Sequence, residues 1–533
     1  MNRMDWLGFS RTAIAAAVAA VSVTAAAPAL AQNTTAAING QVTGADGKPV
    51  AGATVTILHV ESGSTNTATT DDEGRYAARG LRAGGPYTVT VSKTGAQTDK
   101  REGLFLSLAE TLAYDTQIVP SAQVITVTGR SASDKFNRSN MGAGTNIGSR
   151  ELSAYASVQR NLQDYARTDP RLAQTDKGNG SISAAGQNNR FNSITIDGVT
   201  TSDTFGIESN NLPTKKQPIS IDAIQAVQVN LSNYDVTQKG YTGANINAVT
   251  KSGTNDFHGS VYLVTRDDNF VGKSYNRASD TYTDFLPFKE STKGFTLGGP
   301  IIPDRLFFFG GYEEFKSTKA TPAFGPLGSG LINVGISQLA IDTAISTART
   351  TWNIDAGTSA VPSGIELIVK DTLLKLDWNI NDAHRANLRY SKTQQSDPVV
   401  TTLFGANQLS LSSYWYVTDK TIETLVGQWF ADWTPNFSTE LKVSQRDYTQ
   451  RHTPINGTKL PAIRLSFAGA LPTGTTGVNT GTRTLSRASR RRSKTSSTIS
   501  SPPPNGSSPT TTHRLQSSPS AATATAACSS ARR

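Results

Sequence analysis

The chain is poor in cysteine and histidine. Among its 533 residues are one cysteine and five histidines. The cysteine is Cys528, so the rest of the chain has no disulfide framework, thiol nucleophile or cysteine-based metal site. The histidines are scattered, without the spacing of metal ligands. No nucleophile–base motif or phosphate loop is present either. We therefore expect no catalytic residues, no metal and no cofactor.

Long apolar runs are also missing. No segment reaches the roughly 18 consecutive apolar residues that predict a transmembrane helix. The shorter run Thr12–Val23 follows a basic N-terminus and precedes Ala29 and Ala31, which form an A-x-A cleavage pattern. This order predicts a signal peptide over residues 1–31, the alternative being a buried Ala-rich helix. An exported chain without a helical span is periplasmic, secreted or an outer-membrane β-barrel.

Acidic residues are absent from one end of the chain. Residues 482–533 contain eight Arg and one Lys but no Asp, Glu or aromatic residue. They supply most of the formal net charge of +10, and the body is nearly neutral, which argues against a nucleic-acid partner. We predict a disordered basic low-complexity tail over residues 481–533. It could be a natural tail, a linker or an out-of-frame translation. We favour the last because the change near Gly481 is abrupt.

Short alternating strands separated by turn residues occupy residues 37–119. This pattern predicts a small β-sandwich. The strings GQVTGADGKPVAGATVTI and TTDDEGRY resemble the carboxypeptidase regulatory-like domain. Asp71 and Asp72 in the second string predict a turn and not a calcium site, because the further oxygen ligands of an EF-hand loop are missing.

A polar, Gly/Asn-rich loop runs into a short strand in AGQNNRFNSITIDGV (Ala185–Val199), which stops at a strong turn signal. PISIDAIQAVQV and GANINAVTKSGTNDFHGSVY follow it. Together they resemble the plug domain of TonB-dependent outer-membrane receptors, best in the Oar-like branch, and its junction with the barrel. The resemblance implies a mixed α/β plug over residues 149–252, against the alternative of a soluble α/β enzyme. The plug-motif residues are Gly186, Asn189, Arg190, Asn192, Asp197 and Gly198.

Two further features concern the plug and the segment before it. Apolar residues from Leu152 to Tyr165 fall near helical spacing and predict one short amphipathic element. Residues 120–148 are predicted to be a linker. It carries a β-prone string that resembles a TonB box, which would pair with TonB by strand addition. The string is equally consistent with an ordinary strand of the sandwich or the plug. Its residues are Val124, Ile125, Thr126, Val127 and Thr128.

Residues 253–480 show long amphipathic strands joined by short turns on one side and long polar stretches, such as Lys316–Gly364, on the other. Leu374, Leu376 and Trp378 share one strand face while Lys375, Asp377 and Asn379 share the other. Lipid outside and water inside require this two-faced pattern. GGPIIPDRLFFFGGYEEF (residues 298–315) resembles the second and third barrel strands of the same receptor branch. A soluble β-sandwich is the alternative.

About seven barrel strands are expected before the tail, whereas plugged transporters close with 22. An open arc would leave unpaired edges in lipid. The chain is therefore expected to be a truncated or frameshifted copy, whose in-frame parent continues past Gly481.

The expected fold is mainly β: an N-terminal sandwich, an α/β plug, the first strands of an incomplete barrel and a disordered tail. The family resemblance implies a TonB-dependent receptor in the outer membrane of a Gram-negative bacterium, with TonB, membrane lipid and an extracellular substrate as partners. Lys215 and Lys216, in the polar stretch 200–216, could face that substrate, although solvated charge is the more ordinary interpretation. The alternative function is a periplasmic or surface protein whose sandwich binds carbohydrate or protein.

Overall fold

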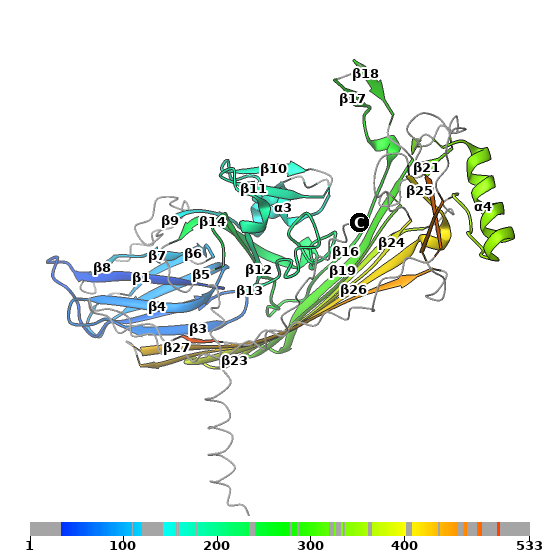
Figure 1. Ribbon diagram of the computed structural model, residues 1–533. Coiled ribbons are helices and arrows are strands. Elements are labelled where there is room, and N and C mark those ends of the chain that lie inside the picture. The colour runs from blue at the N-terminus through cyan, green and yellow to red at the C-terminus, as the bar shows by residue number, and fades with distance from the viewer. Residues whose placement is uncertain are drawn as a thin grey trace, which may run out of the picture.

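The structure, a computed structural model, is shown in Figure 1. It describes residues 34–119, 142–233, 240–318, 324–326, 332–333, 336–360, 365–400, 408–434, 437–455, 462–465, 477–481 and 498–500, apart from residues 97, 109, 156, 158, 177–178, 278–279 and 285–286. No helix in this part of the chain is long and apolar enough to cross a bilayer.

The N-terminal strands form two four-stranded sheets that pack as the predicted sandwich. Apolar residues at alternate positions face the shared core, where Ile38, Ile57 and Val89 are fully buried. Burying each such side chain contributes about 1.5–3 kcal/mol. Asp71 closes a turn, since its Oδ1 accepts the Arg75 N–H at 2.7 Å, as the sequence predicts. One sheet holds β1 (Thr35–Gly44), β4 (Arg75–Arg82), β7 (Thr111–Ala113) and β8 (Thr116–Ile118), and the other holds β2 (Thr54–His59), β3 (Ser64–Thr69), β5 (Gly84–Ser92) and β6 (Asp99–Leu106).

The plug is built on a mixed five-stranded sheet in the order β13-β12-β15-β14-β9. β12 runs parallel to β15, and β14 runs antiparallel to β15 and β9. The 3-10 turn η2 (Ile221–Ala223) feeds directly into β14, and a hairpin of β10 and β11 lies beside the sheet. The strands are β9 (Gly142–Ile147), β10 (Leu172–Asp176), β11 (Ser181–Ala184), β12 (Ser193–Ile196), β13 (Val199–Thr200), β14 (Ile224–Asn233) and β15 (Asn245–Thr250).

The helical part of the plug differs from the prediction. Two short helices, α2 (Ser149–Ala154) and α3 (Leu162–Ala166), replace the single amphipathic element. α2 ends where Tyr155 adopts an extended backbone conformation (φ −79°, ψ 130°), and Arg160, just before α3, has a left-handed φ of 50°. The Asn161 side chain then caps α3 by accepting the Asp164 N–H at 2.8 Å. Periodicity alone cannot show such a break, because Leu152, Leu162 and Tyr165 are buried in one core in either arrangement.

The remaining long strands form one antiparallel sheet in the order β16-β19-β20-β23-β24-β26-β27-β30. Seven of these strands are long, and the eighth, β30, has three residues. β19 and β20 contain the string that resembles the second and third barrel strands. The sheet comprises β16 (His258–Asp267), β19 (Lys289–Ile302), β20 (Leu306–Ser317), β23 (Leu367–Asn381), β24 (His384–Val399), β26 (Tyr416–Thr434), β27 (Phe437–Pro454) and β30 (Thr498–Ser500).

Burial along β23 confirms the two-faced pattern. Leu374, Leu376 and Trp378 are 56%, 41% and 50% exposed on the outer face. In contrast, Lys375, Asp377 and Asn379 are 8%, 5% and 8% exposed on the inner face. An apolar outer face suits lipid, and the polar inner face is covered by the plug and the sandwich.

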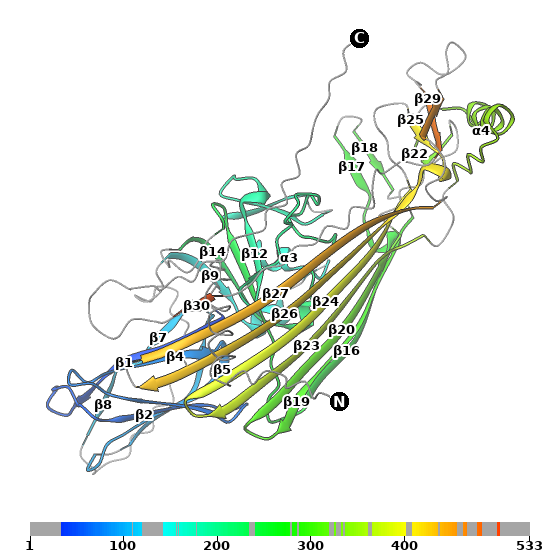
Figure 2. The ribbon, with the colours of Figure 1, turned by 60° about the horizontal axis from the view of Figure 1, so that its bottom comes forward.

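The two ends of this sheet differ in their connections. At the short-turn end, β19–β20 and β23–β24 are joined by tight turns near Asp304 and Asp382, and the sandwich lies close by (Figures 1 and 2). At the long-loop end, the connections contain short elements of their own, including a helix within the long polar stretch Lys316–Gly364. They are η3 (Asp268–Phe270), β17 (Ser274–Asn276), β18 (Thr281–Thr283), β21 (Phe324–Gly325), β22 (Ile332–Asn333), α4 (Gln338–Trp352), β25 (Gln408–Ser410), η4 (Ser412–Tyr414), β28 (Ala462–Leu465) and β29 (Gly477–Gly481).

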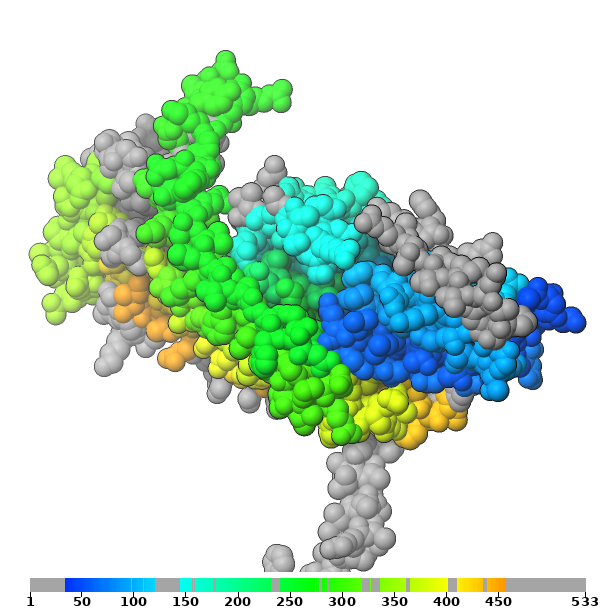
Figure 3. Space-filling view, turned by 180° about the vertical axis from the view of Figure 1, so that it is seen from behind, coloured from blue at the N-terminus to red at the C-terminus, as the bar shows by residue number. Residues whose placement is uncertain are grey.

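The sandwich and the plug lie side by side along the inner face of the curved sheet (Figures 1 and 3). The plug is nearer the long-loop end, and the sandwich is nearer the short turns. This arrangement brings the polar inner face of the sheet against the polar loops of the plug.

Candidate plug–barrel interface

The Asp197-Gly198 turn joins β12 to β13 as a two-residue hairpin loop. Both residues have positive φ, 47° and 69°, which is the backbone of a type I′ turn and explains the preference for Asp-Gly. Inside the plug, the Asp197 carboxylate accepts the Thr250 N–H at 2.9 Å and the Thr250 hydroxyl at 2.8 Å. The turn is thus tied to the end of β15.

Asp197 also faces the barrel wall. Its Oδ2 lies 3.2 Å from a guanidinium nitrogen of Arg389 on β24, and its backbone carbonyl accepts from Lys442 on β27. Lys375 on β23 donates to the Thr250 hydroxyl at 3.2 Å. Burial by itself raises the pKa of Asp197, but Arg389, Lys375 and the Thr250 hydrogen bonds outweigh it and hold the pKa below its usual value. Asp197 is therefore a buried, ionised link between plug and barrel.

The other plug-motif residues hold the plug's own loops. Asn189 donates to the Ser209 carbonyl, and Arg190 donates to the Gly206 carbonyl at 2.8 Å. The buried Asn192 donates to Ile182 O and accepts from Ala244 N, each at 2.9 Å.

The two glycines of the motif lie in turns. Gly186 has φ 80°, in the left-handed region that favours glycine. The Gly198 N–H points to the Asn247 side-chain oxygen at 3.4 Å. The structure gathers the motif around one loop system, of which only the Asp197 turn reaches the barrel wall through an ion pair.

A second set of plug–barrel contacts lies nearer the long-loop end. Lys420 on β26 pairs with Glu208 and donates to Pro213 O at 3.2 Å. Lys215 pairs with Asp397 on β24 at 2.8 Å.

A third set reaches β20. Ser220 donates to Glu313 at 2.9 Å, and the Arg160 guanidinium lies 3.6 Å from the same carboxylate. These three sets of plug–wall contacts are charged or polar, and beside them Phe309 on β20 and Leu373 on β23 pack into the plug's apolar core.

Lys215 and Lys216 are not simply solvated. The Lys215 ammonium is engaged by Asp397, and the Lys216 ammonium lies 3.9 Å from the centre of the Phe315 ring. Burial lowers the pKa of Lys216, although Glu313 and Asp371 act in the opposite direction. Both side chains line a cavity of about 340 Å³ between plug and wall at the long-loop end.

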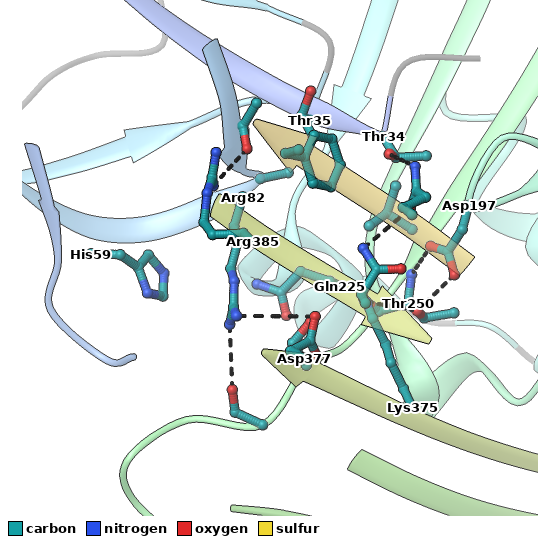
Figure 4. A pocket seen from close by; sticks show the side chains of 18 of the residues that line it. Thr34, Thr35, His59, Arg82, Asp197, Gln225, Thr250, Lys375, Asp377 and Arg385 are labelled. Atoms are coloured by element: carbon teal, nitrogen blue, oxygen red, sulfur yellow. Dashed lines mark hydrogen bonds and ion pairs between the residues drawn. The ribbon is translucent and has the colours of Figure 1, made fainter. Parts of the chain in front are cut away.

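A smaller cavity of about 100 Å³ lies where the sandwich, plug and sheet meet (Figure 4). Arg385 on β24 donates to Gly80 O of the sandwich at 2.8 Å, and Arg82 of the sandwich lies 4.0 Å from Asp377 on β23. His59 lines the same cavity, and burial together with Arg82 lowers its pKa to about 3. These groups join the three parts of the chain around a cavity with room for several water molecules.

Two predicted sites fall outside the described residues: the signal cleavage residues Ala29 and Ala31, and the TonB-box string Val124–Thr128. Within the described ranges, no group of three or more His, Cys, Asp or Glu side chains is arranged to hold a metal ion.

Comparison with known proteins bears on the sandwich and on the first strands of the long antiparallel sheet. Residues 37–119 match the family model of the carboxypeptidase regulatory-like domain, and residues 249–329 match that of an outer membrane beta barrel domain. The chain is 28% identical over 277 residues to the TonB-dependent transporter Oar of Myxococcus xanthus. This alignment covers 50% of this chain and 25% of that protein.

The chain is thus similar to a TonB-dependent transporter of the Oar type. It spans about a quarter of the length of this curated relative. Like other outer-membrane barrel proteins, it belongs to the outer membrane of a Gram-negative bacterium. The matched relatives are transporters and receptors, not enzymes.

Two solved structures are also similar to this chain. The outer membrane transporter YddB from Escherichia coli matches at 14% identity and a TM-score of 0.44, over 63% of this chain and 43% of its own. The siderophore receptor PirA from Acinetobacter baumannii matches at 15% identity and a TM-score of 0.40, over 67% of this chain and 44% of its own.

Sequence reasoning missed the side chains of the barrel strands that contact the plug. Arg389, Lys420 and Lys442 are each at most 3% exposed and face inward, where water-facing residues were expected. The sequence did contain one sign of such contacts: a basic residue on the inward face of a strand whose other face is apolar. That signal identifies the face of the strand but not the plug residue it meets.

Proposed function

We propose that this chain forms the plug and adjoining wall of an outer-membrane transporter, in which energised TonB displaces the plug to admit a substrate. Substrate would enter at the long-loop end and leave toward the short turns, since outer-membrane barrels place long loops outside the cell. The 149–252 plug, 253–480 barrel segment and 120–148 linker belong to this proposal.

The observation that carries the proposal is the chemistry of the plug–barrel interface. Asp197, Glu208 and Lys215 are paired across it with side chains of the sheet. Water can replace such contacts when the plug moves, whereas an apolar interface would lose its stabilisation on exposure. An interface of this kind supports a plug that stays seated at rest and can still be displaced.

A cysteine reporter tests the movement. Ser444 on β27 shares the inner face with Lys442 and Arg446, which donate to Asp197 O and Thr200 O, and it is 8% exposed. In a Cys528→Ser background, the chain carrying Ser444→Cys is labelled in outer membranes with a thiol reagent. Energised TonB should accelerate the labelling of Ser444→Cys. It should not change the labelling rate of the control variant Ala68→Cys, whose side chain is buried in the sandwich. An equal rate with and without TonB would reject the movement.

The TonB-box proposal has its own test. Strand addition requires backbone N–H groups, so Ile125→Pro or Val127→Pro should abolish capture of the chain by the purified periplasmic domain of TonB. Ser131→Pro, in the same linker, is the matched control and should bind normally. Equal capture of all variants would place the TonB contact elsewhere, and no capture of the unaltered chain would reject TonB as the partner.

A further inference from the structure

The cavity at the long-loop end has a volume of about 340 Å³, and many of the side chains that line it are charged. It lies between the plug loop that contains Glu208 and Lys215 and the inner faces of β16, β19 and β20. Its volume is at the lower end of the range for small-molecule sites. Its charged and apolar lining residues are Arg160, Glu208, Lys215, Lys216, Val264, Arg266, Glu290, Phe315 and Leu367.

Most of the charges that line this cavity are already paired. Arg160 pairs with Asp222 and lies 3.6 Å from Glu313. Lys215 pairs with Asp397 at 2.8 Å, and Arg266 with Glu290 at 3.8 Å. Glu208 pairs with Lys420. These residues hold the plug and the wall in place, and little of their charge is left for a ligand.

Lys216 is different. In the described part of the chain its ammonium has neither an ion pair nor a hydrogen bond, and its contact is the face of Phe315 at 3.9 Å. A partly desolvated ammonium without a direct ion pair is costly, and the burial that lowers its pKa outweighs the opposite effect of the more distant Glu313 and Asp371. An anion placed beside it would remove the cost, and Phe315 and Leu367 provide an apolar surface next to that position.

We propose that Lys216 and Phe315 form a subsite for a monoanionic carboxylate with a neighbouring apolar group, such as the C-terminal residue of a peptide. This inference deepens the proposed function, because it names the substrate class of the cavity above the plug. A single free ammonium matches a single negative charge. A phosphate would need further free cations, and Arg160, Lys215 and Arg266 are already neutralised.

The test measures binding of N-acetyl-Leu-Leu, as the free acid and as the C-terminal amide, to the full chain in detergent by calorimetry. The acid should bind about 10- to 100-fold more tightly, the range expected for one charge-assisted contact. Lys216→Met should abolish this preference, and Lys216→Arg should retain it. Lys251→Met, a plug lysine outside the cavity lining, is the control and should behave as the unaltered chain.

Equal affinity for acid and amide would overturn the proposal, as would a preference that survives Lys216→Met. Tighter binding of phenyl phosphate than of the acid would overturn the choice of carboxylate. Unchanged protection of the plug from trypsin shows that each variant is folded. Because no TonB is present, failure of the transport proposal leaves this result unaffected, and failure here leaves TonB capture unaffected.

The pH dependence gives a second readout. Glu313, Asp371, Arg160 and Glu290 surround Lys216, and its pKa lies below the ordinary value near 10.4. Carboxylate affinity should therefore fall as pH rises through this lowered pKa, because the neutral amine loses the attraction. In Lys216→Arg the fall should vanish, since a guanidinium stays charged. An identical fall in both proteins would overturn the role of Lys216.

Discussion

The two sheets of the sandwich meet through Ile38, Ile57 and Val89, all fully buried, whereas the plug meets the barrel wall through Asp197, Glu208 and Lys215. The first contact excludes water and depends on shape and apolar area. The second depends on pairing of charges that water could also solvate. The sandwich is thus built to stay closed, and the plug is built to be held and released.

The largest expected effect comes from breaking a buried pair on the plug side. Asp197→Ala leaves Arg389 buried without its carboxylate and should cost about 3–5 kcal/mol of plug docking. Urea denaturation of the full chain, followed by tryptic cleavage of the plug, measures this loss. The double variant Asp197→Ala with Arg389→Met should recover part of it, because Arg389 is then no longer a buried charge without a partner, whereas the Thr250 hydrogen bonds of the carboxylate remain lost. A double variant as weak as the single one would contradict the pairing.

A cavity in the sandwich core should have a similar but more local effect. Ile57→Ala should destabilise the sandwich by about 2–5 kcal/mol through lost burial and the space left behind. Denaturation monitored by proteolysis within residues 37–119 provides the measurement, and plug cleavage should be unchanged. Raising the salt concentration should not enlarge the loss. Salt sensitivity would indicate that charge, and not packing, dominates this core.

Lowering the pH should destabilise the sandwich and the plug–barrel contact over different pH ranges. The pKa of His59 is about 3 in the folded sandwich and near 6.5 when unfolded, so the unfolded state binds a proton first as pH falls. The contribution of neutral His59 to the free energy of unfolding is complete above pH 6.5. It is lost toward pH 3, by up to about 1.4 kcal/mol per pH unit. Asp197 has a lowered pKa, so its contribution is complete above its usual value near 3.9 and is lost only below it.

Between pH 6.5 and 4 the sandwich should therefore weaken while the Asp197 link holds. Sandwich stability measured across this range should show a smaller pH slope in His59→Gln than in the unaltered chain. Equal slopes would assign the acid sensitivity to other groups.

The smallest effect is expected at an exposed ion pair. Lys100 and Glu102 lie 2.5 Å apart on the sandwich surface, and both are more than half exposed. A double-mutant cycle with Lys100→Ala and Glu102→Ala should give a coupling of about 0.2–1 kcal/mol, reduced by salt. A coupling as large as that of Asp197 with Arg389 would mean that burial is not what distinguishes the two pairs.

Local patterns in the sequence were sufficient for the elements and their faces. Alternation placed Leu376 outward and Asp377 inward on β23, and Asp-Gly chemistry placed a turn at residues 197–198. The same local reasoning failed between Leu152 and Leu162, where the chain leaves the first helix at Tyr155 and passes through the left-handed Arg160 before the second helix begins. That backbone conformation accompanies contacts of Arg160 with Asp222 and Glu313, which lie far along the chain.

By itself, the sequence determined which segments are strands, which face of each is apolar, and where the chain turns. These properties follow from side chains a few residues apart. Tertiary structure alone decided that Asp197 meets Arg389, that Lys420 meets Glu208, and that the Lys216 ammonium lies over the Phe315 ring. Such pairings depend on the seating of one domain against another, because a charged residue specifies the sign of its partner but not its position in the chain.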